Sequence, residues 1–183
     1  MSKKIVAFGA SNSKKSINQQ LAKFAAQQVA DASVNLLDLN DYEMPIYSID
    51  REQATGIPDL AHQFKAALTA SDGIIISFAE HNGAYSTAFK NIFDWISRIE
   101  QDVWGNKPML LLSTAPGGRG GKSVLDIAVS KFNRMNENLI ASFSLPFFGK
   151  NFSGTAGIMD TTLAENFQEQ LQLFVEALDE KKD

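Results

Sequence analysis

The sequence predicts an α/β fold in which helices cover both faces of a parallel sheet. Five short, strand-like apolar runs alternate along the chain with five segments whose apolar residues recur at helical spacing. Two of these runs, residues 73–78 and 109–113, are almost continuously apolar. Strands of a parallel sheet have this pattern because helices bury both of their faces.

The predicted elements follow one another in a regular order. The expected strands are residues 5–8, 34–37, 73–78, 109–113 and 139–145. Helices are expected where apolar stripes begin at Ile17, Leu60, Phe89 and Leu163, and a weaker stripe covers residues 122–134. Residues 40–56 are expected to form one long loop at the sheet rim, and residues 179–183 are expected to fray.

The number of strands narrows the topology. Five βα units are too few for an eightfold barrel, so we expect an open, doubly wound sheet with the flavodoxin-like strand order 2-1-3-4-5. The chain has 183 residues and no internal repeat, low-complexity tract or interdomain linker. The sequence therefore predicts a single domain over residues 1–183, a flavodoxin-like three-layer sandwich.

Composition excludes several classes of function. Seventeen Lys and Arg against 21 Asp and Glu give a net charge of −4, without the basic footprint of a nucleic-acid-binding protein. The absence of cysteine excludes disulfides, thiolate zinc sites and cysteine nucleophiles, so any redox chemistry must come from a cofactor, and we expect no metal site. The apolar run at residues 5–10 is too short for a signal peptide, and no run approaches the roughly 18 residues of a membrane span. We therefore expect a cytoplasmic protein with no membrane partner.

The ligand site is expected where the loops after the first, third and fourth strands meet. The first loop, residues 9–18, opens a helix and contains Ser11, Ser13, Ser16 and Asn18. Hydroxyls and free backbone N–H groups at the positive end of a helix suit a phosphate monoester. The alternative is a polar turn in which Ser16 only caps the helix. The loop lacks G-x-G-x-x-G, so a permanently bound NAD is not expected there.

The second loop, residues 79–84, presents side-chain amides and glycine-exposed backbone groups to the same edge. Such groups can form hydrogen bonds with the polar edge of a flat heterocycle. His81 is either a functional group at the carboxyl end of a strand or an ordinary surface histidine. In the helix that follows, Lys90 and Asp94 have the i, i+4 spacing of a surface ion pair. Trp95 is expected in the core or at a subunit interface.

The third loop, residues 113–121, has four glycines in five residues, so its backbone can approach a ligand closely. Gly121-Lys122-Ser123 resembles the end of an NTPase phosphate loop, but Pro116 stands where that motif requires glycine. Arg119 either contacts a nucleotide phosphate or is solvated. The aromatic-rich segments 95–104 and 143–152 are interface surface or core.

Together the three loops resemble the NADPH-dependent FMN reductase family, the flavodoxin-like quinone, azo and chromate reductases. Residues 10–18 match that family's G-S-x-R-x-x-S-x-N motif. Residues 79–83 and 90–95 match its P-E-Y-N-G and K-N-x-x-D-W motifs, and the resemblance spans residues 1 to about 125. In this chain Ser13 stands in place of a phosphate-binding Arg, His81 in place of Tyr, and Ala79 in place of Pro.

The resemblance implies a cofactor site for FMN, with NADPH or NADH as a transient co-substrate. The phosphate would be bound by the first loop, at Ser11, Ser13, Ser16, Ile17 and Asn18. The ring edge would lie against Glu80, His81, Asn82 and Gly83, and its other side near Ser113, Thr114, Gly117 and Gly118. No catalytic residue is implied, because the cofactor carries the chemistry.

The resemblance also implies a ping-pong cycle that passes electrons to a small-molecule acceptor: a quinone, an azo compound, a flavin or a metal oxyanion. His81 as a proton donor to the acceptor is a hypothesis. A homodimer or homotetramer is expected from the family. The alternatives are a non-enzymatic electron carrier of the flavodoxin type and a flavin-free interaction protein.

Overall fold

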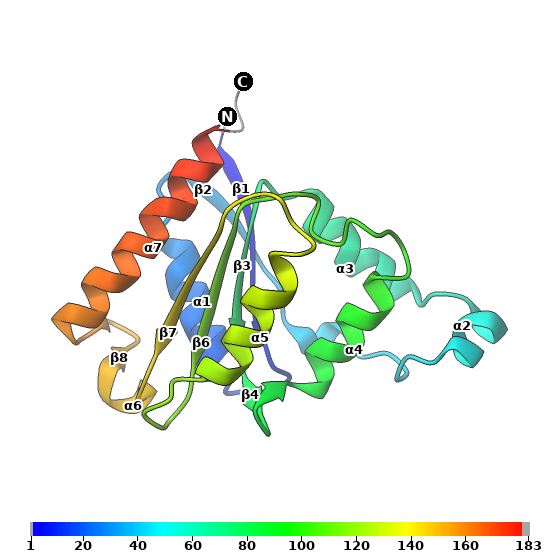
Figure 1. Ribbon diagram of the computed structural model, residues 1–183, viewed down its shortest axis with the longest axis horizontal. Helices are drawn as coiled ribbons and strands as arrows, with labels where there is room; N and C mark the ends of the chain where they lie inside the picture. Colours follow the sequence, from blue (N-terminus) through cyan, green and yellow to red (C-terminus); the bar gives the residue numbers. More distant parts are fainter. Residues whose placement is uncertain (1, 181–183) are drawn as a thin grey trace.

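The computed structural model describes residues 2–180 and has a central five-stranded sheet (Figure 1). The strands are β1 (Lys3–Ala10), β2 (Ala32–Leu36), β3 (Gly73–Phe78), β6 (Met109–Thr114) and β7 (Ile140–Leu145). Every neighbouring pair is parallel, and the order is β2-β1-β3-β6-β7. Counted along the chain, these strands have the order 2-1-3-4-5, which confirms the predicted flavodoxin-like fold.

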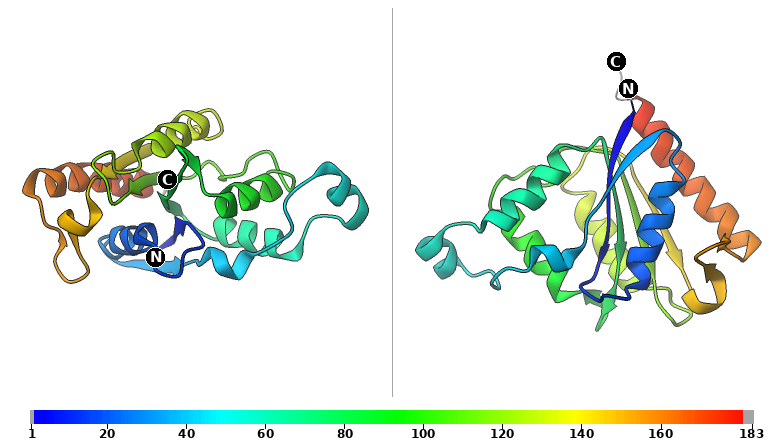
Figure 2. Two further views of the ribbon diagram at one scale, coloured as in Figure 1. Left: turned by 90° about the horizontal axis from the view of Figure 1, so that it is seen from below. Right: turned by 180° about the vertical axis from the view of Figure 1, so that it is seen from behind.

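Helices form a layer on each side of this sheet. Figure 2 shows α1 (Ile17–Gln27) and α7 (Thr161–Glu180) on one face. The other face is covered by α3 (Asp59–Thr69), α4 (Thr87–Ile96) and α5 (Lys122–Phe132). Successive strand residues point to opposite faces, so Ile74 and Ile76 pack with the second layer and Ile75 packs with the first. The continuous apolar run of β3 is therefore used on both faces, as predicted.

The expectation of one long loop over residues 40–56 is wrong. A 3₁₀ helix, η1, spans Leu39–Tyr42, and α2 spans Ile49–Thr55. The hydroxyl of Ser48 accepts the N–H of Arg51 at the start of α2, and Gly56, with φ of 76°, ends it. No residue of α2 is buried, and the helix extends beyond α3 and α4 at the edge of the molecule (Figure 1).

The C-terminal helix runs further than expected. Asp179 and Glu180 belong to α7, so the prediction that they fray is wrong, and residues 181–183 lie outside the described part of the chain. The Asp179 carboxylate lies 2.9 Å from the ammonium group of Lys3, which ties the helix end to β1. Within residues 2–180 no helix is both long and apolar enough to cross a bilayer.

The aromatic-rich segments belong mostly to the core. Trp95 is buried, and its indole N–H donates to the carbonyl of Pro45 at 2.7 Å. Trp104 is also buried and packs on Phe132, with ring centroids 4.5 Å apart. After β7 the chain forms α6 (Phe148–Asn151) and a short hairpin of β8 (Phe152–Ser153) and β9 (Gly157–Ile158), while Phe147 stays 49% exposed.

Candidate functional site at the carboxyl edge of the sheet

The loops after β1, β3 and β6 meet at one edge of the sheet, where they line a pocket of about 220 Å³. This edge lies at the bottom of Figure 1, away from the termini. Eight of the predicted site residues line the pocket: Ser11, Ser13, Ser16, Ile17, Asn18, Glu80, His81 and Thr114. The other five lie outside this lining: Asn82, Gly83, Ser113, Gly117 and Gly118. With Ser13 in place of the family's Arg, Lys14 or Lys15 was the expected source of positive charge, and of these two Lys15 lines the pocket.

The first loop is held against the sheet by Gln19. Its side-chain oxygen accepts the N–H of Gly9 at 2.5 Å, and its amide nitrogen donates to the carbonyl of Leu37 at 2.9 Å. Gly9 allows this close approach, because a Cβ at that position would lie 2.4 Å from the backbone nitrogen of Gln19. The start of α1 is thereby fixed at the pocket.

Ser16 caps α1, as the structural alternative proposed. Its hydroxyl oxygen accepts the N–H of Gln19 at 3.1 Å, and the Ser11 hydroxyl oxygen accepts the N–H of Ser13 at 3.1 Å. Both hydroxyl groups keep a hydrogen that can be donated to an anion. The first turn of α1 carries no acidic side chain, so the positive end of the helix faces the pocket uncompensated.

Asn18 is buried and joins three elements. Its side-chain oxygen accepts the Ser77 hydroxyl at 2.8 Å and the N–H of Thr114 at 3.0 Å. Its amide nitrogen donates to the carbonyl of Thr114 at 3.1 Å. Asn18 therefore positions the third loop beside the first. Ser77 was missed, although a hydroxyl in an otherwise apolar strand was a visible signal.

The second loop is a tight hairpin formed by β4 (Glu80–His81) and β5 (Ala84–Tyr85). Its turn residues Asn82 and Gly83 have φ of 52° and 77°, the left-handed pair of a two-residue hairpin. The ring of Tyr85 packs on Phe89. Burial raises the pKa of the Tyr85 phenol to about 12, so this group stays protonated. His81 is held exposed at the mouth of the pocket.

The carboxylate of Glu80 is directed at α5. It accepts the N–H groups of Ser123 and Val124 at 3.1 and 3.3 Å. The N-cap residue of that helix is Gly121, which has no side chain to cap it. Glu80 thus supplies from the hairpin the cap that α5 lacks, and its negative charge suits the helix dipole.

Replacing Glu80 with alanine is expected to lower the free energy of unfolding by about 1 kcal/mol, the usual effect of losing a cap. Urea denaturation of the protein without cofactor measures this change. Glu80→Gln keeps an oxygen acceptor and is the matched control, expected to lose less. An alanine variant as stable as the parent would contradict the capping role.

The third loop is fixed by hydroxyl groups beneath it. The Ser113 and Ser144 hydroxyls both donate to the carbonyl of Gly120, at 2.8 and 3.0 Å. The Thr114 hydroxyl donates to the carbonyl of Leu145 at 2.7 Å. The side chains of Ser113 and Thr114 therefore bind protein atoms.

The exposed part of the third loop is the backbone at Gly117 and Gly118. A Cβ on Gly117 would meet nothing within 4 Å, whereas one on Gly118 would lie 2.7 Å from the Phe147 ring. The N–H of Phe147 donates to the carbonyl of Gly117 at 3.0 Å. Arg119 donates to the Ser123 hydroxyl at 2.6 Å, so its guanidinium lies over the start of α5.

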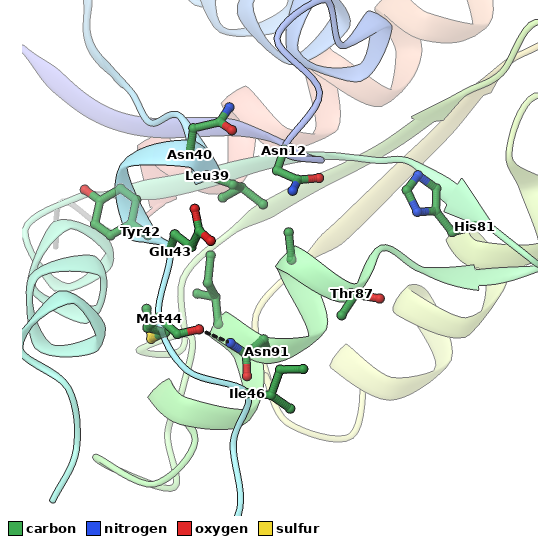
Figure 3. Close-up of a pocket in the computed structure, with 12 residues that line it drawn as sticks. Asn12, Leu39, Asn40, Tyr42, Glu43, Met44, Ile46, His81, Thr87 and Asn91 are labelled. Atoms are coloured by element: carbon green, nitrogen blue, oxygen red, sulfur yellow. Dashed lines mark hydrogen bonds between the residues drawn. The ribbon is translucent and has the colours of Figure 1, made fainter. Parts of the chain in front are cut away.

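A second pocket, of about 350 Å³, opens on the other side of His81 (Figure 3). It lies between α4, the first loop and the segment 39–46, and the sequence analysis missed it. Asn91 holds that segment to α4, because its side-chain oxygen accepts the N–H of Tyr47 and its nitrogen donates to the carbonyl of Met44.

On the same helix, the predicted ion pair of Lys90 and Asp94 is confirmed, with 2.7 Å between the ammonium nitrogen and a carboxylate oxygen. No group of three or more His, Asp or Glu side chains in residues 2–180 is placed to hold a metal ion.

Known proteins are similar to this chain in sequence. A 2-hydroxy-1,4-benzoquinone reductase from a Burkholderia species is 34% identical over 122 residues, which cover 66% of this chain and 64% of that protein. A quinone reductase from Escherichia coli K12 is 29% identical over 109 residues, covering 59% and 57% of the two chains. This chain thus spans less than two thirds of the length of either relative.

A solved structure supports the fold over the whole chain. The flavoenzyme NAD(P)H:(acceptor) oxidoreductase FerB from Paracoccus denitrificans superposes with a TM-score of 0.75 at 22% identity, covering 97% of this chain and 98% of that one. The sequence model of the NADPH-dependent FMN reductase family matches residues 3–147. Because this match covers most of the sequence and includes all three loops, the chain belongs to the NADPH-dependent FMN reductase family.

Proposed function

We propose that this protein is an FMN-dependent NAD(P)H oxidoreductase that passes electrons to quinones and related small acceptors. The observation that carries the proposal is the 220 Å³ pocket at the positive end of α1, lined by Ser11, Ser13, Ser16 and Lys15. Hydroxyl donors, a helix N-terminus and one cation are the groups that bind a phosphate monoester. The names of the two quinone reductases among the relatives support the choice of acceptor.

The residues around this pocket fit FMN. Ser11, Ser13, Ser16 and the first N–H groups of α1, at Ile17 and Asn18, would hold the phosphate, and Lys15 would supply the charge of the Arg that Ser13 replaces. The hairpin residues 80–83 would border the ring on one side. The exposed backbone at Gly117 and Gly118, beside Ser113 and Thr114, would border it on the other.

When bound, FMN supplies the redox chemistry: it accepts a hydride from NADPH or NADH and passes the electrons to the acceptor. The chain's part is to hold the phosphate, to place backbone N–H groups near the ring and to leave one face accessible. We infer a ping-pong cycle, in which the oxidised nicotinamide leaves before the acceptor binds. A cytoplasmic homodimer or homotetramer belongs to the same proposal.

His81 is our candidate for delivering a proton to the acceptor, because it is exposed between the two pockets and is a histidine. His81→Phe is expected to lower quinone turnover several-fold. His62, on α3 and outside both pockets, is the matched control as His62→Phe. A His81→Phe variant with the parent's turnover would exclude the role.

The function is tested by a visible absorption spectrum recorded under nitrogen. We expect added FMN to bind, its absorption to bleach on addition of NADPH or NADH, and the colour to return with a quinone. A protein that binds FMN but bleaches only with a separate reductase would be an electron carrier of the flavodoxin type. A protein that does not bind FMN would contradict the proposal.

A further inference from the structure

The two pockets at the carboxyl edge differ in charge. They share His81, and the 220 Å³ pocket has Lys15 in its wall. Its one acidic residue, Glu80, has its carboxylate bound by N–H groups of α5. Among the described residues that line the 350 Å³ pocket, Glu43 is the only carboxylate, and none is Lys or Arg. An anion is therefore favoured on one side of His81 and disfavoured on the other.

Glu43 is held at this pocket by the segment that carries it. Met44 and Leu39 are buried on either side of it. The carbonyl of Pro45 accepts hydrogen bonds from Trp95 and Asn91, at 2.7 and 3.2 Å. Figure 3 shows the Glu43 side chain on the pocket side of this segment, with the Asn12 amide opposite. The backbone that carries Glu43 is thus fixed beside α4, and its exposed side chain lies at the pocket.

A neighbouring carboxylate, that of Asp41, adds to the negative charge of Glu43 near the pocket. Asp41 precedes Tyr42 of the pocket wall, and burial together with the Asp41 carboxylate raises the pKa of the Tyr42 phenol. Of the cations on the adjoining helices, Arg51 of α2 donates to the carbonyl of Ile46 at the pocket wall, and two others are held in ion pairs. Lys90 is paired with Asp94, and Arg98 with Glu52.

The remaining walls suit a flat, uncharged molecule. Leu39, Met44, Ile46 and Ile92 supply apolar surface, and Asn12 and Asn40 supply amide groups. A volume of about 350 Å³ is at the lower end of the range for small-molecule sites. An acceptor of one or two aromatic rings is expected to fit.

We propose that the 350 Å³ pocket receives the electron acceptor and that Glu43 determines its charge, favouring uncharged quinones over anionic acceptors. The inference rests on the proposed function. A quinone takes two electrons and one proton from NAD(P)H and a second proton from solvent, which His81 would deliver, and leaves as the uncharged hydroquinone. An acceptor carrying a sulfonate or another anionic group brings its charge close to the carboxylate. Glu43 is exposed, so we expect a penalty of about five-fold per unit charge at low salt.

The test is the ratio of kcat/KM for 1,4-naphthoquinone to kcat/KM for its 2-sulfonate, measured in the parent and in two variants. Comparing one ratio between proteins cancels the difference in reduction potential of the two acceptors. Glu43→Gln is expected to lower the ratio about five-fold and Glu43→Lys about 25-fold, and 0.5 M NaCl should reduce both effects. Glu165→Gln, on α7 at the other face of the sheet, makes the same change in net charge and should leave the ratio unchanged.

A binding measurement separates acceptor choice from turnover. Calorimetric titration of the FMN-loaded protein with the sulfonate, without NAD(P)H, should show a dissociation constant about five-fold lower in Glu43→Gln. Turnover with unchanged ratios and unchanged dissociation constants in both Glu43 variants would overturn the inference and leave the proposed function standing. No NAD(P)H oxidation with either acceptor in the FMN-loaded parent would contradict both.

Discussion

Gly9→Ala is expected to lower the free energy of unfolding by about 3 kcal/mol, at the upper end of the range for overpacked sites. The added Cβ would lie 2.4 Å from the nitrogen and 2.7 Å from the Cα of Gln19. Both are backbone atoms of α1, so no side-chain rotation relieves the collision. Either β1 or the start of α1 must move, and with it the first loop, residues 9–18.

Urea denaturation without FMN measures this loss, and an FMN titration of the folded variant is expected to show weaker binding as well. Gly149→Ala is the control, because a Cβ there would meet nothing within 4 Å and the residue lies in the short helix α6. Its stability should stay within about 0.5 kcal/mol of the parent. Equal stability of the Gly9 and Gly149 variants would show that the loop and α1 are not packed as described.

Asn18→Ala is expected to lower the free energy of unfolding by about 3 kcal/mol, because it leaves several buried polar groups without partners. The N–H of Thr114 and the hydroxyl of Ser77 both lose their acceptor, and the carbonyl of Thr114 loses a donor. Thr114 is the last residue of β6, where the chain enters the third loop, so this loop is expected to loosen. FMN binding should weaken even though the amide itself points at protein atoms.

A double-mutant cycle with Ser77→Ala tests this role more sharply than the single variant. If Asn18 and Ser77 act through their hydrogen bond, the double variant will be more stable than the sum of the two losses predicts, by about 1 kcal/mol. Asn12→Ala, at an exposed position of the same loop, is the control for stability. Additive losses, or a loss for Asn18→Ala no larger than for Asn12→Ala, would contradict the arrangement.

The strands were predictable because the burial pattern of each strand is local information, and their order followed from the number of βα units. The continuous apolar run of residues 73–78 could only be a strand covered on both faces, and the structure places it at the centre of the sheet. Helix α2 was missed for the opposite reason. It buries no residue, so its sequence has no apolar stripe, and only the cap at Ser48 and the glycine at Gly56 mark its ends.

The position of the site followed from topology, whereas the roles of its side chains did not. Parallel strands bring their carboxyl ends together, so the three loops had to meet. Whether Asn18 or Glu80 faces a ligand or another protein group depends on packing between distant segments. The second pocket combines residues 39–46 with α4, and no local pattern links these segments.

The central claim is that the first loop and the start of α1 bind the phosphate of FMN. It is tested most directly by comparing the dissociation constants of FMN and riboflavin, which share the ring and differ in the phosphate. Two charge-assisted hydrogen bonds are worth about 3 kcal/mol, so we expect FMN to bind roughly 100-fold more tightly than riboflavin. Equal affinities for the two flavins would contradict the claim.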